Sequence, residues 1–404
     1  DKRGIAMNDF SLGKMPEFIF GHKAEEKCAE LIKRYGGTRV LIHHSGEPFV
    51  MPLIEKVRGI LEDAGMFVMD LGGVVPNPRL DLVYKGIELC KENRIDFVLA
   101  VGGGSVIDSS KGIALGAVYD GDVWDFYLQK EIPVARLPLG SISTFAGTGS
   151  ESTRASVVTK YEEKLKRSAD DIDIIRPDFA IMDPELTFSV PPYQTASGIS
   201  DITSHLLENY FSRTKHVDFS DNLTFGALKT VIKNAPLVMK DPCNYDARAE
   251  IMITAPFAIN GIIRFGRSGD WSCHLMEHEM SAQWDVAHGA GLACITPVWM
   301  RYVYESDIPL FAKLGVNVFG LSYDFDDPKA TAIETINRFE AFFKSLGMPS
   351  RLRDFKNIRE EDLNDEAFHE MARRVPYYRD NGTRIGVVQP LDENDIVEIY
   401  RRSI

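Results

Sequence analysis

The sequence has little cysteine and no long apolar run. Its 404 residues include five cysteines, which are scattered along the chain without the CxxC spacing of thiolate metal sites and redox motifs. This usage argues against a disulfide framework and is typical of the reducing cytoplasm, where we expect this protein to be found. No apolar run approaches the length needed to cross a bilayer, so we expect no membrane partner.

An excess of positive charge is also missing. Lys and Arg number 46 against 59 Asp and Glu, and the formal net charge of −13 argues against nucleic acid as a main partner. The 44% of hydrophobic and 26% of charged residues are ordinary for a soluble globular protein. Because 404 residues exceed what one hydrophobic core usually holds, two domains are expected.

The first half of the chain alternates short apolar runs with amphipathic stretches. The predicted strands are 18–20, 40–42, 67–71, 97–101, 134–139 and 179–182. Strands that alternate with helices indicate parallel pairing. After Pro191 and Pro192, long helix-compatible segments replace this pattern. The sequence therefore predicts an α/β domain with a parallel sheet over residues 1–190 and an all-α domain over residues 191–404.

Small-residue loops follow two of the predicted strands. Gly102, Gly103, Gly104 and Ser105 come directly after the apolar run 97–101 and precede a predicted helix, which is a context in which a phosphate group binds. The turn lacks the third glycine of GxGxxG, and taken alone it fits a bare connection equally well. A second loop, SISTFAGTGS at 141–150, follows the strand predicted at 134–139. Two such loops can line one crevice and hold a dinucleotide.

Histidines gather in the segment 271–292, which reads WSCHLMEHEMSAQWDVAHGAGL. His274 and His278 are one helical turn apart there, and Asp201 and His205 have the same spacing upstream. The set Asp201, His205, His274 and His288 offers three nitrogens and one oxygen without sulfur, which suits Fe(II), Zn(II) or another first-row divalent ion. His278 then lies beside the metal and is free to transfer protons.

The same segment contains a competing motif. Residues 274–278 read H-x-x-E-H, the pattern of inverted zinc peptidases, in which both histidines bind zinc and Glu277 activates water. That interpretation gives no role to Asp201, His205 and His288, or to the two loops. We therefore rank it below a redox enzyme.

Taken together, these segments resemble the iron-containing (group III) alcohol dehydrogenase family, and most closely its NADPH-dependent butanol and aldehyde dehydrogenase branch. The resemblance covers nearly the whole chain and is carried by GGGSVIDSSKGIA, STFAGTGSE, ASGISDITSHLLENYF and GDWSCHLMEHEMSAQWDVAHGAGLA. It implies a dinucleotide-binding α/β domain, a helical metal-binding domain and a homodimer.

The resemblance also assigns roles to individual residues. The implied metal ligands are Asp201, His205, His274 and His288, and the implied catalytic residue near the nicotinamide is His278. The implied cofactor-binding residues are Gly102, Gly103, Gly104, Ser105, Asp108, Thr144, Thr148 and Lys166. Members that prefer NAD carry an aspartate where this chain has Ser45, followed by Gly46. Loss of that charge favours NADP, while Glu47 leaves NAD as an alternative.

The implied activity is reversible hydride transfer between NAD(P)(H) and a primary alcohol or aldehyde such as butanol or butanal, with Fe(II) or Zn(II) as Lewis acid. Three alternatives remain: a glycerol dehydrogenase or dehydroquinate synthase-like metalloenzyme acting on a polyol or phosphorylated substrate, the zinc peptidase, and a non-catalytic nucleotide-binding or metal-storage protein. The first predicts extra Lys and Arg around the metal, and residues 271–292 contain neither.

Overall fold

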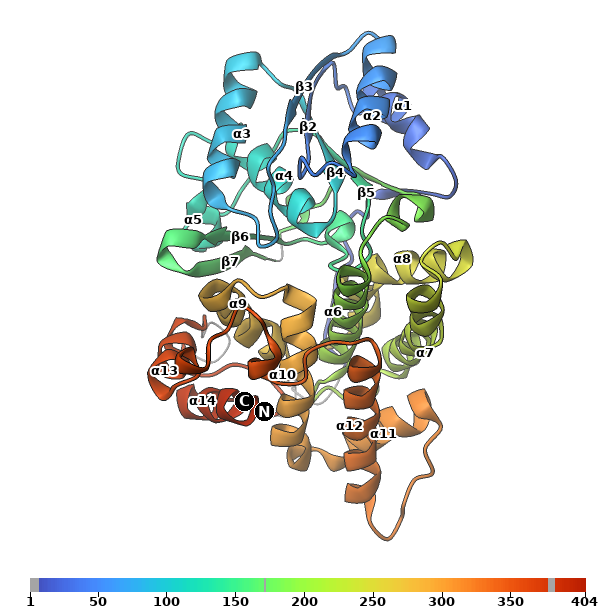
Figure 1. Ribbon diagram of the computed structural model, residues 1–404, viewed down its shortest axis with the longest axis vertical. Helices are drawn as coiled ribbons and strands as arrows, with labels where there is room; N and C mark the ends of the chain where they lie inside the picture. The colour runs from blue at the N-terminus through green and yellow to red at the C-terminus, as the bar shows by residue number, and fades with distance from the viewer. Residues whose placement is uncertain (1–6, 171, 377–381) are drawn as a thin grey trace. The chain divides into compact units, whose positions relative to one another are not determined.

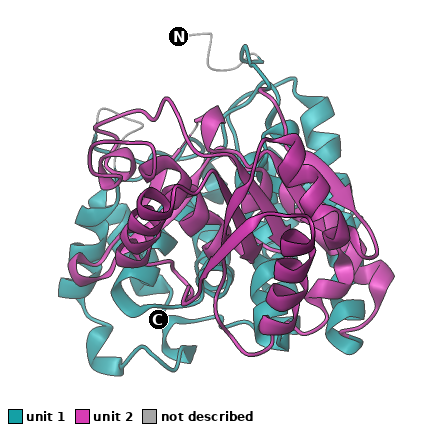
Figure 2. Ribbon diagram, turned by 90° about the horizontal axis from the view of Figure 1, so that it is seen from above, with its two compact units in different colours: residues 1–12, 191–241, 257–404 teal, residues 13–190, 242–256 magenta. Residues whose placement is uncertain are grey.

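The computed structural model describes residues 7–170, 172–376 and 382–404, and the chain divides into two compact units, coloured separately in Figure 2. Unit 1 comprises residues 1–12, 191–241 and 257–404. Unit 2 comprises residues 13–190 and 242–256. The chain therefore leaves unit 2 after Val190 and returns to it once.

A six-stranded parallel sheet with the order β1-β8-β5-β4-β2-β3 forms the centre of unit 2 (Figure 1). Its strands are β1 (Glu17–Phe20), β2 (Arg39–His43), β3 (Phe67–Leu71), β4 (Phe97–Gly102), β5 (Leu139–Ser143) and β8 (Phe179–Met182). Strand β3 pairs with β2 on one side. Strand β4 pairs with β2 on its other side, and β5 extends the sheet beyond β4 in that opposite direction. This change of direction is the place where parallel sheets bind ligands, at the carboxyl ends of the strands.

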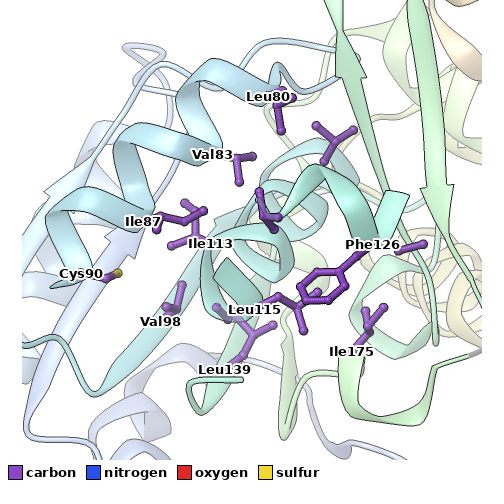
Figure 3. Packing of buried hydrophobic residues seen from close by; sticks show 14 of the residues in the cluster. Leu80, Val83, Ile87, Cys90, Val98, Ile113, Leu115, Phe126, Leu139 and Ile175 are labelled. Atoms are coloured by element: carbon purple, nitrogen blue, oxygen red, sulfur yellow. The ribbon is translucent and has the colours of Figure 1, made fainter. Parts of the chain in front are cut away.

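Helices cover both faces of this sheet and make two separate cores. The helices of these cores are α1 (Cys28–Arg34), α2 (Met51–Asp63), α3 (Leu80–Asn93), α4 (Gly104–Gly116) and α5 (Trp124–Tyr127). Helix α8 (Tyr245–Ile259) instead contributes Met252 to a small cluster with Ala180 and Met182. Successive residues of a strand point to opposite faces, so Val40 packs with α1 and α2 whereas Leu41 packs with α3 and α4. Figure 3 shows the second core, where Val83 and Ile87 lie close to Ile113. Coverage on both faces explains the uninterrupted apolar run of β4.

The strand predicted at 134–139 is wrong, because β5 begins only at Leu139. Val134 is 89% exposed. Pro138 has no N–H to donate, so it cannot continue a sheet ladder. The strand itself reads LGSIS. Its small polar residues interrupt the apolar run that would indicate a buried strand. A two-stranded antiparallel sheet, β6 (Ser156–Lys160) with β7 (Leu165–Ala169), follows it.

Unit 1 is helical, as the sequence predicts. Its helices are α6 (Pro192–Tyr210), α7 (Asp218–Lys240), α9 (Ser272–Trp284), α10 (His288–Val303), α11 (Ile308–Phe319), α12 (Pro328–Ser345), α13 (Asp365–Arg374) and α14 (Glu393–Arg402). Within the described part of this unit, β pairing is limited to an isolated bridge between Ile385 and Leu391. The α/β and all-α fold class is thus confirmed.

Helix α6 is the central helix of unit 1. It is buried from Thr195 to Tyr210 and packs against α7 and α10. A Cβ atom on Gly289 of α10 would overlap the carbonyl oxygen of Ser197, so the two backbones approach as closely as glycine allows. This close approach brings the start of α10 to the N-terminal half of α6.

Short 3₁₀ helices join these elements. They are η2 (Ala24–Lys27), η3 (Ser150–Ser152), η4 (Tyr161–Glu163), η5 (Asp173–Ile175), η6 (Pro184–Thr187), η7 (Ile262–Arg264), η8 (Tyr304–Ser306), η9 (Leu352–Asp354) and η10 (Glu360–Asp362). Among the described residues, no helix combines the length and the apolar character that crossing a membrane requires.

Candidate functional site

Four side chains of unit 1 predicted to bind metal come together around one carboxylate. Asp201 and His205 lie one turn apart on α6, His274 lies in the first turn of α9, and His288 begins α10. Oδ1 of Asp201 is 3.4 Å from Nδ1 of His205 and 3.7 Å from Nε2 of His274. It is 3.8 Å from Nε2 of His288.

The atoms that face one another in this group fit a metal ion. Oδ1 of Asp201, Nδ1 of His205 and Nε2 of His274 are buried, and each lacks a hydrogen-bond partner among the described residues. Buried polar atoms are nearly always paired, so three such atoms within 4.8 Å of one another fit a site for a cation. Three imidazole nitrogens and a carboxylate oxygen suit Fe(II) or Zn(II).

The protonation states of these side chains agree with that fit. Burial alone would raise the pKa of Asp201, but the charges of the imidazoles around it hold that pKa at about 2, so the group is a carboxylate at neutral pH. Burial lowers the pKa of His205 to about 4, which leaves a neutral imidazole. Burial also lowers the pKa of His274, but the carboxylates of Glu208 and Asp201 outweigh burial and raise it to about 9. A metal ion therefore competes with a proton at His274.

Two carboxylates behind the histidines hold the ring nitrogens that point away from Asp201. Oε2 of Glu208 contacts Nδ1 of His274, and Oε2 of Glu277 contacts Nδ1 of His288. Such carboxylates set the orientation of metal-binding imidazoles. Sequence reasoning missed Glu208, although its place one turn after His205 on α6 was a signal for it.

Glu277 and His278 do not fit a peptidase. The carboxylate of Glu277 is fully buried, and it contacts His288 and the hydroxyl of Ser281, so it is not placed to activate water. His278 is half-buried, and its ring centroid lies 5.5 Å from that of His288. Ligand atoms of Glu277, His278 and His288 also lie within 4.8 Å of one another. His278 is therefore beside the group around Asp201.

The two loops of unit 2 pack against each other at the carboxyl ends of β4 and β5. A Cβ atom on Gly103 would lie 2.9 Å from Cβ of Phe145, and one on Gly104 would overlap the side chain of Thr148. Gly103 precedes α4 and provides no side-chain cap, which leaves the first N–H groups of that helix for an anion. Thr144 and Thr148 are half-buried in the second loop.

Asp108 on α4 links this helix to the second loop and to β6 through hydrogen bonds within the protein. Its Oδ1 accepts a hydrogen bond from the hydroxyl of Ser150, and its Oδ2 accepts one from the backbone N–H of Val157 at 3.1 Å. Nζ of the fully buried Lys111 lies 3.4 Å from the same carboxylate and donates to Ser150 at 2.8 Å. All of these contacts are with protein groups, so the cofactor contact expected of Asp108 stays a prediction.

Lys166 and Ser45 lie near other carboxyl ends of the sheet. Nζ of Lys166 on β7 donates to Oδ1 of Asn77, which follows β3, at 3.0 Å. Ser45 is half-buried just after β2, its carbonyl oxygen accepts from the N–H of Gly73 at 3.0 Å, and Glu47 is exposed. All predicted cofactor residues thus belong to unit 2, where they lie in loops, in strands or in the N-terminal part of α4.

His43 is a buried histidine of unit 2 that sequence reasoning did not single out. Its Nδ1 lies 2.8 Å from the carbonyl oxygen of Leu71 and its Nε2 2.8 Å from the hydroxyl of Ser109. Burial lowers its pKa to about 4, so it is neutral, with Nδ1 donating and Nε2 accepting. It links β2 and β3 to α4 and is a core histidine.

Comparisons with known proteins cover both units. The models "Iron-containing alcohol dehydrogenase" and "Fe-containing alcohol dehydrogenase family, C-terminal" match residues 16–184 and 195–404. The chain is 38% identical to NADH-dependent butanol dehydrogenase A of Clostridium acetobutylicum, over 98% of this chain and 100% of the relative. It is 32% identical to NADPH-dependent aldehyde reductase YqhD of Escherichia coli, over 86% of this chain and 89% of the relative. A crystal structure of NADH-dependent butanol dehydrogenase A from Thermotoga maritima matches with a TM-score of 0.92 at 32% identity, covering 99% of each chain.

We predict that one divalent ion binds per chain and that His274→Ala and His288→Ala lose it. Each change removes an imidazole nitrogen that faces Asp201. Metal content is measured by mass spectrometry after reconstitution with Fe(II) or Zn(II) and desalting. His369→Ala, which removes a half-buried histidine paired with Glu393, should keep the ion. Full occupancy in both site variants would contradict the ligand assignment.

Proposed function

The chain belongs to the iron-containing alcohol dehydrogenase family, and from this premise we propose that it interconverts primary alcohols and aldehydes, such as butanol and butanal, with NADP(H). Membership makes it an oxidoreductase. The observation that carries the proposal is the set of three imidazole nitrogens within 3.8 Å of the buried Oδ1 of Asp201. The names of two relatives, a butanol dehydrogenase and an aldehyde reductase, support the substrate class.

In this proposal Asp201, His205, His274 and His288 hold Fe(II) or Zn(II). The bound ion supplies Lewis acidity to the alcohol or carbonyl oxygen, and the bound nicotinamide accepts or supplies the hydride. The chain provides a buried ligand set that water does not reach easily, since Asp201, His205 and His274 are all at most 7% exposed.

His278 is the residue we propose for proton transfer. Oxidation of an alcohol releases the hydroxyl proton, and reduction of an aldehyde takes one up. His278 is half-buried beside His288. Its ring therefore lies next to the proposed metal centre and is also accessible to solvent. An imidazole changes its charge near neutral pH, so it can pass a proton in either direction.

The nucleotide is assigned to unit 2, in the role of the dinucleotide-binding domain, with unit 1 as the metal-binding domain. We propose that the N–H groups at the start of α4 bind the pyrophosphate and that Thr144, Thr148 and Lys166 contact the cofactor. Two relatives carry different names, NADH-dependent and NADPH-dependent, so Ser45 carries our preference for NADP. A homodimer in the cytoplasm belongs to the same proposal.

The proposed activity predicts metal-dependent oxidation of NADPH by butanal. The protein is reconstituted with Fe(II) or Zn(II), and absorbance at the nicotinamide band is followed with a panel of aldehydes. Arg264 lies 5.9 Å from the ring centroid of Trp271, whose ring neighbours His274, so a phosphorylated aldehyde is included, and glycerol is tested with NADP in the reverse direction. His274→Ala is the inactive control. If no aldehyde supports metal-dependent turnover, the proposal fails.

Ser45→Asp should shift the preference from NADPH towards NADH. A carboxylate next to a 2′-phosphate costs about 1–3 kcal/mol, which lowers kcat/KM for NADPH by roughly 5- to 150-fold. Ser45→Asn is the matched control, because asparagine has the size of aspartate without its charge. Equal or better use of NADH by the unmodified protein would refute the NADPH assignment and point to Glu47 as the ribose ligand.

His278→Asn should slow turnover by about 100-fold and leave metal content near normal. Asparagine keeps a polar side chain but cannot carry the proton. The same change at a metal ligand would empty the site, which distinguishes this proposal from a peptidase. Steady-state rates and metal content are measured together, with His369→Asn as control. Loss of the ion from His278→Asn, together with loss of all activity from Glu277→Gln, would support the peptidase instead.

A further inference from the structure

Glu208 lies on the same face of α6 as two of the proposed metal ligands. Asp201, His205 and Glu208 occupy positions i, i+4 and i+7 of one helix. The side chain of Glu208 is fully buried, where a carboxylate without hydrogen bonds would be very costly. The hydrogen-bond partners of Glu208 therefore indicate its role.

The carboxylate of Glu208 contacts the first turn of α9. Oε1 accepts a hydrogen bond from the backbone N–H of Cys273 at 2.7 Å, and Oε2 accepts one from the backbone N–H of His274 at 3.2 Å. These N–H groups have no acceptor within their own helix, because α9 begins at Ser272. Oε2 also contacts Nδ1 of the His274 ring. One carboxylate thus caps the helix and holds the imidazole.

We propose that Glu208 is a positioning residue that fixes the tautomer of His274, an inference that rests on the metal centre proposed above. An imidazole binds a metal through the nitrogen without a proton, and the hydrogen bond at its other nitrogen decides which one that is. Both oxygens of Glu208 already accept hydrogen bonds from backbone N–H groups, so the side chain acts as an acceptor towards the ring as well, and Nδ1 carries the proton. Nε2, which faces Oδ1 of Asp201 at 3.7 Å, then has its lone pair available.

Glu277 holds His288 in a similar way, but its second oxygen has a partner of another kind. Oε2 contacts Nδ1 of His288, and Oε1 accepts from the hydroxyl of Ser281. That hydroxyl also lies 3.2 Å from the carbonyl oxygen of Val286. A hydroxyl can donate or accept. An amide at position 277 can therefore keep its oxygen towards His288 and direct its NH₂ group to Ser281.

An amide at position 208 does not have this freedom, because the backbone N–H of Cys273 can only donate. If the amide oxygen accepts from Cys273, its NH₂ group faces Nδ1 of His274 and drives the proton onto Nε2, the nitrogen needed for the metal. If the amide turns over, its NH₂ group meets the N–H of Cys273, and two buried donors oppose each other. Either arrangement weakens metal binding.

The test is the affinity of the full-length protein for Zn(II), measured by competition with a chromophoric chelator. Glu208→Gln should bind Zn(II) about 10- to 100-fold more weakly than the unmodified protein, and Glu277→Gln should lose less than about tenfold. Glu279→Gln is the matched control, because it removes a buried carboxylate of α9 that pairs with Arg374 at 3.1 Å, and it should bind normally. Thermal unfolding shows whether each variant is folded.

A second measurement does not depend on the folding of Glu208→Gln. Histidine ¹⁵N spectra of the zinc-loaded unmodified protein, assigned by triple-resonance experiments, should show His274 protonated at Nδ1. A proton on Nε2 would overturn the inference, and so would a folded Glu208→Gln that binds Zn(II) normally. An equal loss in Glu277→Gln would overturn it as well. Failure of the unmodified protein to bind Zn(II) would overturn the proposed metal centre together with this inference.

Discussion

A carboxylate that is buried away from water must be neutralised by its neighbours, and the design of unit 1 depends on this constraint at Asp201. The side chain is 2% exposed, and its Oδ1 has imidazole nitrogens from α6, α9 and α10 around it at 3.4–3.8 Å. His274, whose pKa is raised to about 9, balances part of this charge as an imidazolium. A divalent cation can replace that proton, and it satisfies the imidazole lone pairs at the same time.

Close backbone contacts make such a convergence possible. Gly289 follows His288 directly, and its lack of a side chain lets α10 touch the backbone of α6 at Ser197. Unit 2 uses the same device, since Gly103 and Gly104 let the first loop pack on Phe145 and Thr148 of the second. In both units glycine therefore places functional groups where a larger residue would separate two elements.

The residues proposed as metal ligands could be selected from the sequence because each follows a local rule. Asp201 and His205 have helical spacing, and His274 and His288 belong to a short segment in which histidines are concentrated. Strand β5 was not predictable in this way, because LGSIS lacks the apolar run of a buried strand. Glu208 was missed for a different reason. Its role depends on contacts with α9, and no pattern within α6 shows which helix will pack there.

The path of the chain through its two units has a consequence for synthesis on the ribosome. Residues 242–256 belong to unit 2, and Met252 packs with Ala180 and Met182 in a small core cluster. The carbonyl oxygen of Pro256 accepts a hydrogen bond from the hydroxyl of Ser152 at 3.2 Å. Domains generally fold in the order in which they emerge, but this one stays incomplete until α6 and α7 have also been made. The nascent sheet must therefore wait, with part of its apolar surface uncovered, while some 50 residues of the other unit are added.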